Sequence, residues 1–183
     1  VEAHPSHLNK MLANDELDMG FVSSFEYCSR PEKYRILADL SISASGPVGS
    51  VFLFSKVGIQ DLVGHKVLLS DHSETSTNLA KIILEEFYGL QPTYLTGGVR
   101  SPLADQCKAV MAIGDDALRI VESGEYPIHL DLGDVWFKHT GLPFVFAVCA
   151  VQETICKEQG ESVRRIKNEF IRCREKGADN LHN

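Results

Sequence analysis

Short apolar runs alternate along the chain with segments in which apolar residues recur every three to four positions. The two most apolar runs, 48–55 and 144–150, have the composition of buried strands. Shorter runs of the same kind begin near Leu17, Val67 and Ala109. An order in which strands and helices alternate is typical of an α/β fold, which is therefore the predicted fold class.

The segment 66–87 predicts a strand, a hydroxyl-rich turn and a helix with one apolar face. Ser73 suits the N-cap position of this helix, because its hydroxyl can accept a hydrogen bond from a backbone N–H of the first turn. The hydroxyls of Thr75 and Ser76 are then expected to face outward with the remaining free N–H groups. A helix start of this kind favours an anion. Ordinary capping and solvation of the same residues is the alternative.

The order of the predicted elements indicates two lobes. Residues 1–55 and 144–183 are expected to form lobe 1, and residues 56–143 an inserted lobe 2, with the runs 48–55 and 144–150 crossing between them. A ligand would bind in the central cleft between the lobes. A single doubly wound sheet would give a similar order of elements and is the alternative.

Composition and charge narrow the class of partner. The chain has 183 residues, of which 44% are apolar and 23% charged, and its formal net charge is -7. No basic stripe is visible, so neither nucleic acid nor an anionic membrane surface is expected as a partner. The longest apolar run is far too short to span a bilayer. The five cysteines include no C-x-x-C pair, which favours reduced thiols in a cytoplasmic protein.

The sequence contains no glycine-rich phosphate loop, no G-x-S-x-G elbow and no cysteine pair for a metal or redox site, so no metal or cofactor is expected. The polar residues that remain are hydroxyls at predicted strand ends and at one helix start: Ser23, Ser24, Ser50, Ser73, Thr75 and Ser76. Such hydroxyls are good donors to carboxylates but poor nucleophiles without a neighbouring base. The residues alone therefore predict a two-lobed α/β protein that binds a small anion.

Six short blocks of the sequence are distinctive: LDMGFVSSFEY at 17–27, SGPVGS at 45–50, SETS at 73–76, IGDDALR at 113–119, DLGDVW at 131–136 and TGLPFVFA at 140–147. Together they resemble the chorismate dehydratase family of menaquinone biosynthesis. The blocks GDDALR and TGLPFVFA, in this order and spacing, are together specific for the family. The likeness extends from about Glu2 to Val151.

The resemblance implies the two-lobed fold of type II periplasmic binding proteins, with a central cleft, and a reaction without a cofactor. Chorismate would lose water to give 3-[(1-carboxyvinyl)oxy]benzoate, the first step of the futalosine route to menaquinone. By position, Ser50 matches the family's active-site serine and would be catalytic. Asp115 would contact the substrate, although an acidic first helical turn is the alternative for it. The other substrate contacts would be Ser23, Ser24, Ser73, Thr75 and Ser76.

Two other functions stay open. The sister enzyme of the same pathway, which makes 1,4-dihydroxy-6-naphthoate, shares the fold and the hydroxyl-rich helix start, but the blocks GDDALR and TGLPFVFA favour the dehydratase. A non-catalytic binding protein for a small carboxylate is the second alternative. The family begins with a strand and an asparagine-containing turn that nothing in this chain matches, so lobe 1 is expected to lack its N-terminal strand.

Overall fold

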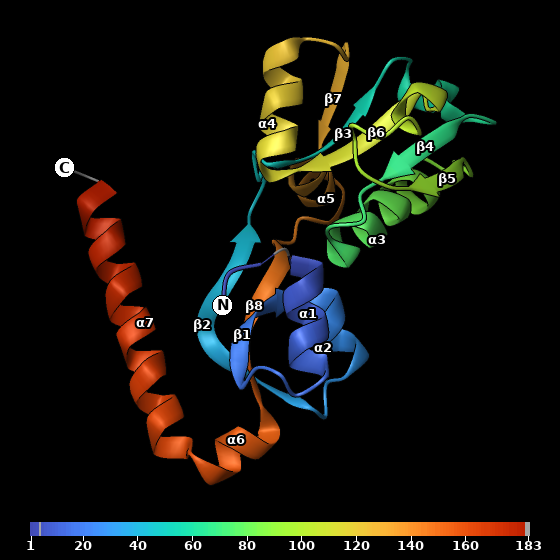
Figure 1. The fold of residues 1–183 in the computed structure, drawn as a ribbon. Helices are drawn as coiled ribbons and strands as arrows, with labels where there is room; N and C mark the ends of the chain where they lie inside the picture. The colour runs from blue at the N-terminus through green and yellow to red at the C-terminus, as the bar shows by residue number, and fades with distance from the viewer. Residues whose placement is uncertain (4, 182–183) are drawn as a thin grey trace. The chain divides into compact units, whose positions relative to one another are not determined.

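The fold is described from a computed structural model of the protein, which describes residues 1–3 and 5–181. Its contacts divide the chain into two compact units. Unit 1 comprises Val1–Ile42 and Val145–Asn183, and unit 2 comprises Ser43–Phe144. Each unit combines a β-sheet with helices (Figure 1), which confirms the predicted α/β class. Within the described part of the chain, none of the helices has the length and apolar character that crossing a bilayer requires.

A five-stranded sheet with the order β5-β4-β6-β3-β7 forms the centre of unit 2. Its strands are β3 (Val51–Ser55), β4 (Lys66–Leu69), β5 (Thr93–Thr96), β6 (Ala109–Ile113) and β7 (Ile128–Asp131). β4 is parallel to β5 and β6, whereas β3 is antiparallel to β6 and β7. The inner strands β3 and β6 are almost entirely buried, as expected of apolar strands that are covered on both faces.

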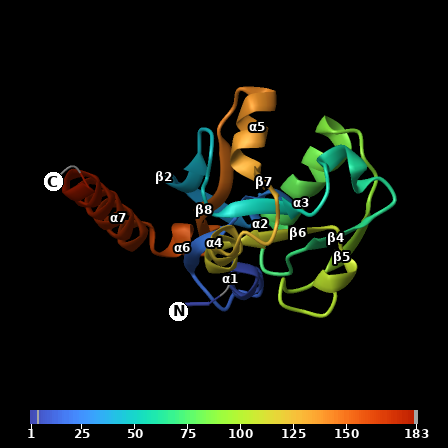
Figure 2. The ribbon, with the colours of Figure 1, turned by 90° about the horizontal axis from the view of Figure 1, so that it is seen from above.

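Helices cover both faces of this sheet. They are α3 (Glu74–Ile82), which continues as the π-helical turn η2 (Ile83–Phe87), α4 (Gly114–Ser123) and α5 (Leu132–Thr140), with 3-10 turns η1 (Ile59–Leu62) and η3 (Ala104–Gln106). Figure 2 shows α4 on one face of the sheet and α3 and α5 on the other. On the α4 side, Ala117 and Ile120 pack in one core cluster with Phe54 and Val110.

Unit 1 contains a three-stranded sheet with the order β1-β8-β2. Its strands are β1 (Met19–Ser23), β2 (Tyr34–Ala44) and β8 (Phe144–Gln152), and its helices are α1 (Pro5–Ala13), α2 (Ser24–Ser29), α6 (Glu153–Glu158) and α7 (Gly160–Leu181). Leu12 of α1 packs in one core cluster with Val148, whereas Val163 of α7 packs in another with Cys149. Since successive residues of a strand point to opposite faces, α1 and α7 cover opposite faces of this sheet.

The structure places the first crossing between the units at Ile42–Ser43, not after residue 55 as the sequence predicts. The run 48–55 becomes a strand only at Val51, and this strand pairs with β6 and β7 inside the sheet of unit 2. Gly49 has a φ of +73°, a left-handed conformation that interrupts the extended backbone just before the strand.

Candidate functional site

Three helices of unit 2 begin at the same edge of its sheet. β4, β6 and β7 run toward this edge and lead into α3, α4 and α5. β3 starts there, because Val51 lies opposite Ile113 and Phe52 lies opposite Asp131 in the antiparallel register. Ligands of α/β sheets bind beyond the carboxyl ends of strands, and helix starts favour anions. We call this candidate site the helix-start edge; it comprises Ser50, Ser70–Ser76, Gly114–Asp116 and Asp131.

Ser73 caps α3, as predicted. Its Oγ accepts a hydrogen bond from the Ser76 backbone N–H (3.3 Å), and its hydroxyl donates to Ser76 Oγ (3.0 Å). Thr75 and Ser76 are only 5% and 3% exposed. The prediction that they face outward is therefore wrong. They lie one helical turn before Leu79 and Ala80, on the buried face of α3. Ser76 is the acceptor in its bond with Ser73, so its own hydroxyl proton can still be donated.

Ser50 lies immediately before β3 and beside the first residue of α4. Its carbonyl accepts a hydrogen bond from the Gly114 N–H at 2.8 Å. Its side chain is half-buried, and its hydroxyl makes no hydrogen bond to any residue that the structure describes. The structure therefore leaves the Ser50 hydroxyl able to bond to a ligand.

The two acidic residues at the start of α4 have different surroundings. Asp116 Oδ1 lies 3.1 Å from Arg100 Nη2 and 3.6 Å from Arg119 Nη1, so its charge is balanced. Asp115 is exposed and forms no ion pair or hydrogen bond with the described residues. A carboxylate in this state can accept a hydrogen bond from a ligand hydroxyl, but it repels a ligand carboxylate.

Asp131 also belongs to the helix-start edge, although the sequence pattern predicts no role for it in the site. Its Oδ1 caps α5 by accepting from the Asp134 N–H (3.1 Å) and also accepts from the Val48 N–H (3.1 Å). Its Oδ2 accepts from the Gly49 N–H (2.7 Å). The N-cap was recognisable in the sequence as an aspartate between a strand and a helix. The contacts with Val48 and Gly49 were not, because those residues are far away along the chain.

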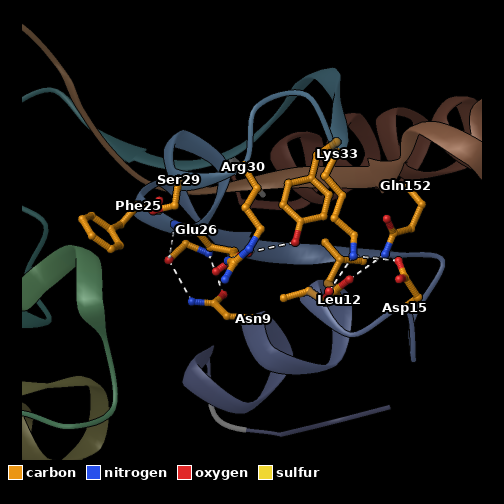
Figure 3. A network of polar contacts seen from close by, with 12 residues as sticks. Asn9, Leu12, Asp15, Phe25, Glu26, Ser29, Arg30, Lys33 and Gln152 are labelled. Carbon is orange, nitrogen blue, oxygen red and sulfur yellow. Dashed lines mark hydrogen bonds and ion pairs between the residues drawn. The ribbon is translucent and has the colours of Figure 1, made fainter.

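Ser23 and Ser24 lie in unit 1, where β1 ends and α2 begins. Ser23 Oγ accepts from Asn9 Nδ2 (2.9 Å) and from the Glu26 N–H (3.1 Å), and thereby caps α2. Figure 3 shows Asn9 and Glu26 in a polar network that also contains Arg30. Both acceptor positions of Ser23 are thus occupied, and only its hydroxyl proton remains for a ligand.

Glu26 is the charged centre of this network in unit 1. It is 5% exposed, pairs with Arg30 Nη1 and accepts a hydrogen bond from the Tyr34 hydroxyl at 2.8 Å. Burial, together with the bond to Glu26, raises the pKa of Tyr34 well above its ordinary value, so the phenol remains a donor. The network therefore fixes the position of α2 and of the serines at its start.

Three kinds of group at the helix-start edge are able to contact a ligand: hydroxyls, one unpaired carboxylate and the backbone N–H groups of the helix starts. Among the residues that the structure describes, no group of three or more His, Cys, Asp or Glu side chains is placed to hold a metal ion.

The partly or fully buried cysteines lie outside the helix-start edge. Burial raises the pKa of the thiols of Cys107, Cys149 and Cys156, which keeps them in the unreactive thiol form.

Comparison with solved structures assigns the fold to the periplasmic-binding-protein class. The periplasmic aliphatic sulphonate binding protein SsuA from Escherichia coli is similar with a TM-score of 0.59 at 16% identity, over 95% of this chain and 62% of that one. Protein AF1704 from Archaeoglobus fulgidus is similar with a TM-score of 0.69 at 23% identity, over 98% of this chain and 66% of that one.

Sequence comparison then identifies the family. A family model described as "Menaquinone biosynthesis" matches residues 1–183, so the chain belongs to this menaquinone biosynthesis family. The chain is also 35% identical over 167 residues to the chorismate dehydratase of Thermus thermophilus, a match that covers 82% of this chain and 60% of that protein. It therefore spans about 60% of the length of this curated relative. The family resemblance seen in the sequence blocks is confirmed.

Proposed function

We propose that the protein acts as a chorismate dehydratase, a hydro-lyase that converts chorismate to 3-[(1-carboxyvinyl)oxy]benzoate and water in menaquinone biosynthesis. The observation that carries this proposal is the 35% identity to the chorismate dehydratase of Thermus thermophilus. The substrate is a small dicarboxylate. The proposal places the reaction in the cytoplasm, in agreement with an odd number of cysteines that include no C-x-x-C pair.

The proposed reaction places modest demands on the protein. Loss of the ring proton beside the enol ether gives a carbanion that is conjugated with the ring carboxylate. Loss of the adjacent hydroxyl, which leaves as water, then makes the ring aromatic. The protein has to hold the two carboxylates, orient the leaving hydroxyl and exclude water, tasks that hydrogen-bond donors in fixed positions can perform.

The helix-start edge provides groups suited to these tasks. The start of α3 would receive a substrate carboxylate through its backbone N–H groups and the hydroxyls of Thr75 and Ser76. Ser50, whose hydroxyl has no partner among the described residues, would bond to the reacting part of the ring. Asp115 would accept from the ring hydroxyl rather than face a carboxylate. Ser23 in unit 1 remains a candidate contact through its hydroxyl proton, and Ser24, the first residue of α2, remains a candidate contact beside it.

Incubation of the purified protein with chorismate tests the proposal. The expected result is the aromatic enol ether, separated by liquid chromatography and identified by mass spectrometry, from reactions with no added metal or cofactor. Protection against thermal unfolding by chorismate, without any product, would replace the dehydratase with a binding protein for a small carboxylate. If chorismate yields no product and gives no protection against unfolding, both functions are contradicted.

The double variant Thr75→Ala and Ser76→Ala is expected to bind chorismate more weakly, by about 1–3 kcal/mol, because hydrogen bonds to a carboxylate are lost. Titration calorimetry on the folded variant measures this change. Asn78→Ala is the matched control, since Asn78 lies on the next turn of α3 with a partly exposed side chain that donates to the Glu74 carbonyl. Equal affinities of the double variant and the control would limit Thr75 and Ser76 to packing of α3.

A further inference from the structure

The loop 45–50 leads into β3 but does not itself extend this strand of the unit 2 sheet. Gly46 has a φ of +113° and Gly49 a φ of +73°, conformations that residues with a Cβ rarely adopt. The N–H groups of Val48 and Gly49 therefore have no neighbouring strand to bond to. Gly49 is exposed, but Val48 is partly buried, and a partly buried backbone donor needs another acceptor.

Asp131 is the acceptor for both N–H groups. Oδ1 lies 3.1 Å from the Val48 nitrogen, and Oδ2 lies 2.7 Å from the Gly49 nitrogen. Hydrogen bonds to a charged carboxylate are stronger than neutral ones, and the use of both oxygens fixes the orientation of the loop as well as its distance. The same carboxylate caps α5 through the Asp134 N–H, so the loop is joined to the first turn of a helix.

Gly133 independently brings the loop close to α5. A Cβ at this position would lie 2.8 Å from the Gly46 carbonyl oxygen and 3.3 Å from Val48 Cβ. The first distance is shorter than real Cβ atoms show, and its partner is backbone, so any larger residue would push the loop away. Gly133 is buried in the first turn of α5, two residues after Asp131.

We propose that Asp131, with Gly133, is a positioning residue for Ser50, an inference that rests on the proposed function. Ser50 follows Gly49 directly, and its carbonyl is held by the Gly114 N–H. Its hydroxyl has no partner among the described residues, so its direction depends on the backbone on either side. Asp131 fixes the backbone on the N-terminal side, and Gly114 fixes it on the C-terminal side.

Asp131→Asn tests the bond to Gly49 while retaining one oxygen for the cap of α5. The amide NH2 cannot accept from the Gly49 N–H. Hydrogen exchange of the Gly49 amide, followed by NMR, is expected to accelerate about tenfold, and kcat for chorismate to fall about tenfold to a hundredfold with a smaller change in KM. Asp134→Asn is the matched control. It removes a carboxylate from the same helical turn, but this carboxylate accepts from Lys138 and does not contact the loop.

Gly133→Ala provides a second variant that retains the Asp131 side chain and adds a Cβ 3.3 Å from its Oδ1 as well as 2.8 Å from the Gly46 carbonyl oxygen. It is expected to lower kcat in the same manner, because the added Cβ displaces the loop that precedes Ser50. Gly177→Ala is its control, since a Cβ at Gly177 meets nothing within 4 Å. Thermal unfolding of all four variants verifies that the proteins compared are folded.

The outcomes separate this inference from the proposed function. Unchanged Gly49 exchange in Asp131→Asn, or a fall in kcat that Asp134→Asn reproduces, would overturn the positioning role. An increase in KM without a fall in kcat would overturn it as well. If the unaltered protein forms no product while Gly49 exchange accelerates in Asp131→Asn, the proposed reaction fails and the role of Asp131 in holding the loop stands.

Discussion

Replacing Ser50 with alanine is expected to lower kcat for chorismate by about a hundredfold, with KM changed by no more than about threefold. The reason is the position of its hydroxyl, which has no hydrogen-bond partner among the described residues and lies at the edge where three helices begin. A hydrogen bond from this hydroxyl to the reacting part of the ring is stronger in the transition state than in the bound substrate. Removing the hydroxyl therefore lowers kcat more than it weakens substrate binding.

Ser123→Ala is the control for this measurement. Ser123 ends α4, where its hydroxyl donates to the Ile120 carbonyl at 2.8 Å, and it lies at the opposite end of that helix from Gly114. Steady-state kinetics of both variants, measured at equal concentrations of folded protein, give the comparison. An unchanged kcat in Ser50→Ala would remove Ser50 from the reaction and leave it as a loop residue.

Replacing Phe54 with alanine is expected to lower the free energy of unfolding by about 3–5 kcal/mol. Phe54 is 0% exposed at the centre of unit 2. Its ring centroid lies 5.5 Å from that of Phe52, 5.9 Å from Tyr126 and 5.1 Å from His129. Truncation leaves a cavity among side chains of β3 and of the segment 126–129, and the rigid sheet beneath them cannot collapse to fill it.

Urea unfolding followed by circular dichroism measures this change, with Phe137→Ala as the control. Phe137 is 37% exposed on α5, in the same unit, and its truncation is expected to cost about 1 kcal/mol or less. Equal changes in the two variants would mean that the packing around Phe54 does not contribute to the stability of unit 2.

Features that depend on neighbouring residues could be predicted from the sequence. The cap at Ser73 and the helix that follows it are examples, because a hydroxyl and a backbone N–H three residues later are brought together by the chain itself. The apolar runs of β6 and β8 were also evident, since buried strands are uniformly apolar. Family membership followed from the short blocks around these elements.

Features that depend on distant residues could not be predicted. The burial of Thr75 and Ser76 follows from how α3 packs, and the contact of Asp131 with Val48 and Gly49 joins segments 82 or more residues apart. The apolar periodicity of residues 153–176 predicts a single helix, but the structure divides this segment into α6 and α7 at Gln159, whose φ of -129° and ψ of 34° lie outside the helical region. Periodicity reports which face is apolar and not whether the backbone is continuous.

The strand order of unit 1 has a consequence for how the chain folds during its synthesis. β8 is the middle strand of the sheet, yet it is the last of its three strands to leave the ribosome. Unit 2 is one uninterrupted stretch, so all of its strands are already available when translation reaches β8. We therefore expect unit 2 to fold first. Until β8 has been synthesised, β1 and β2 have unpaired edges that chaperones would protect from aggregation.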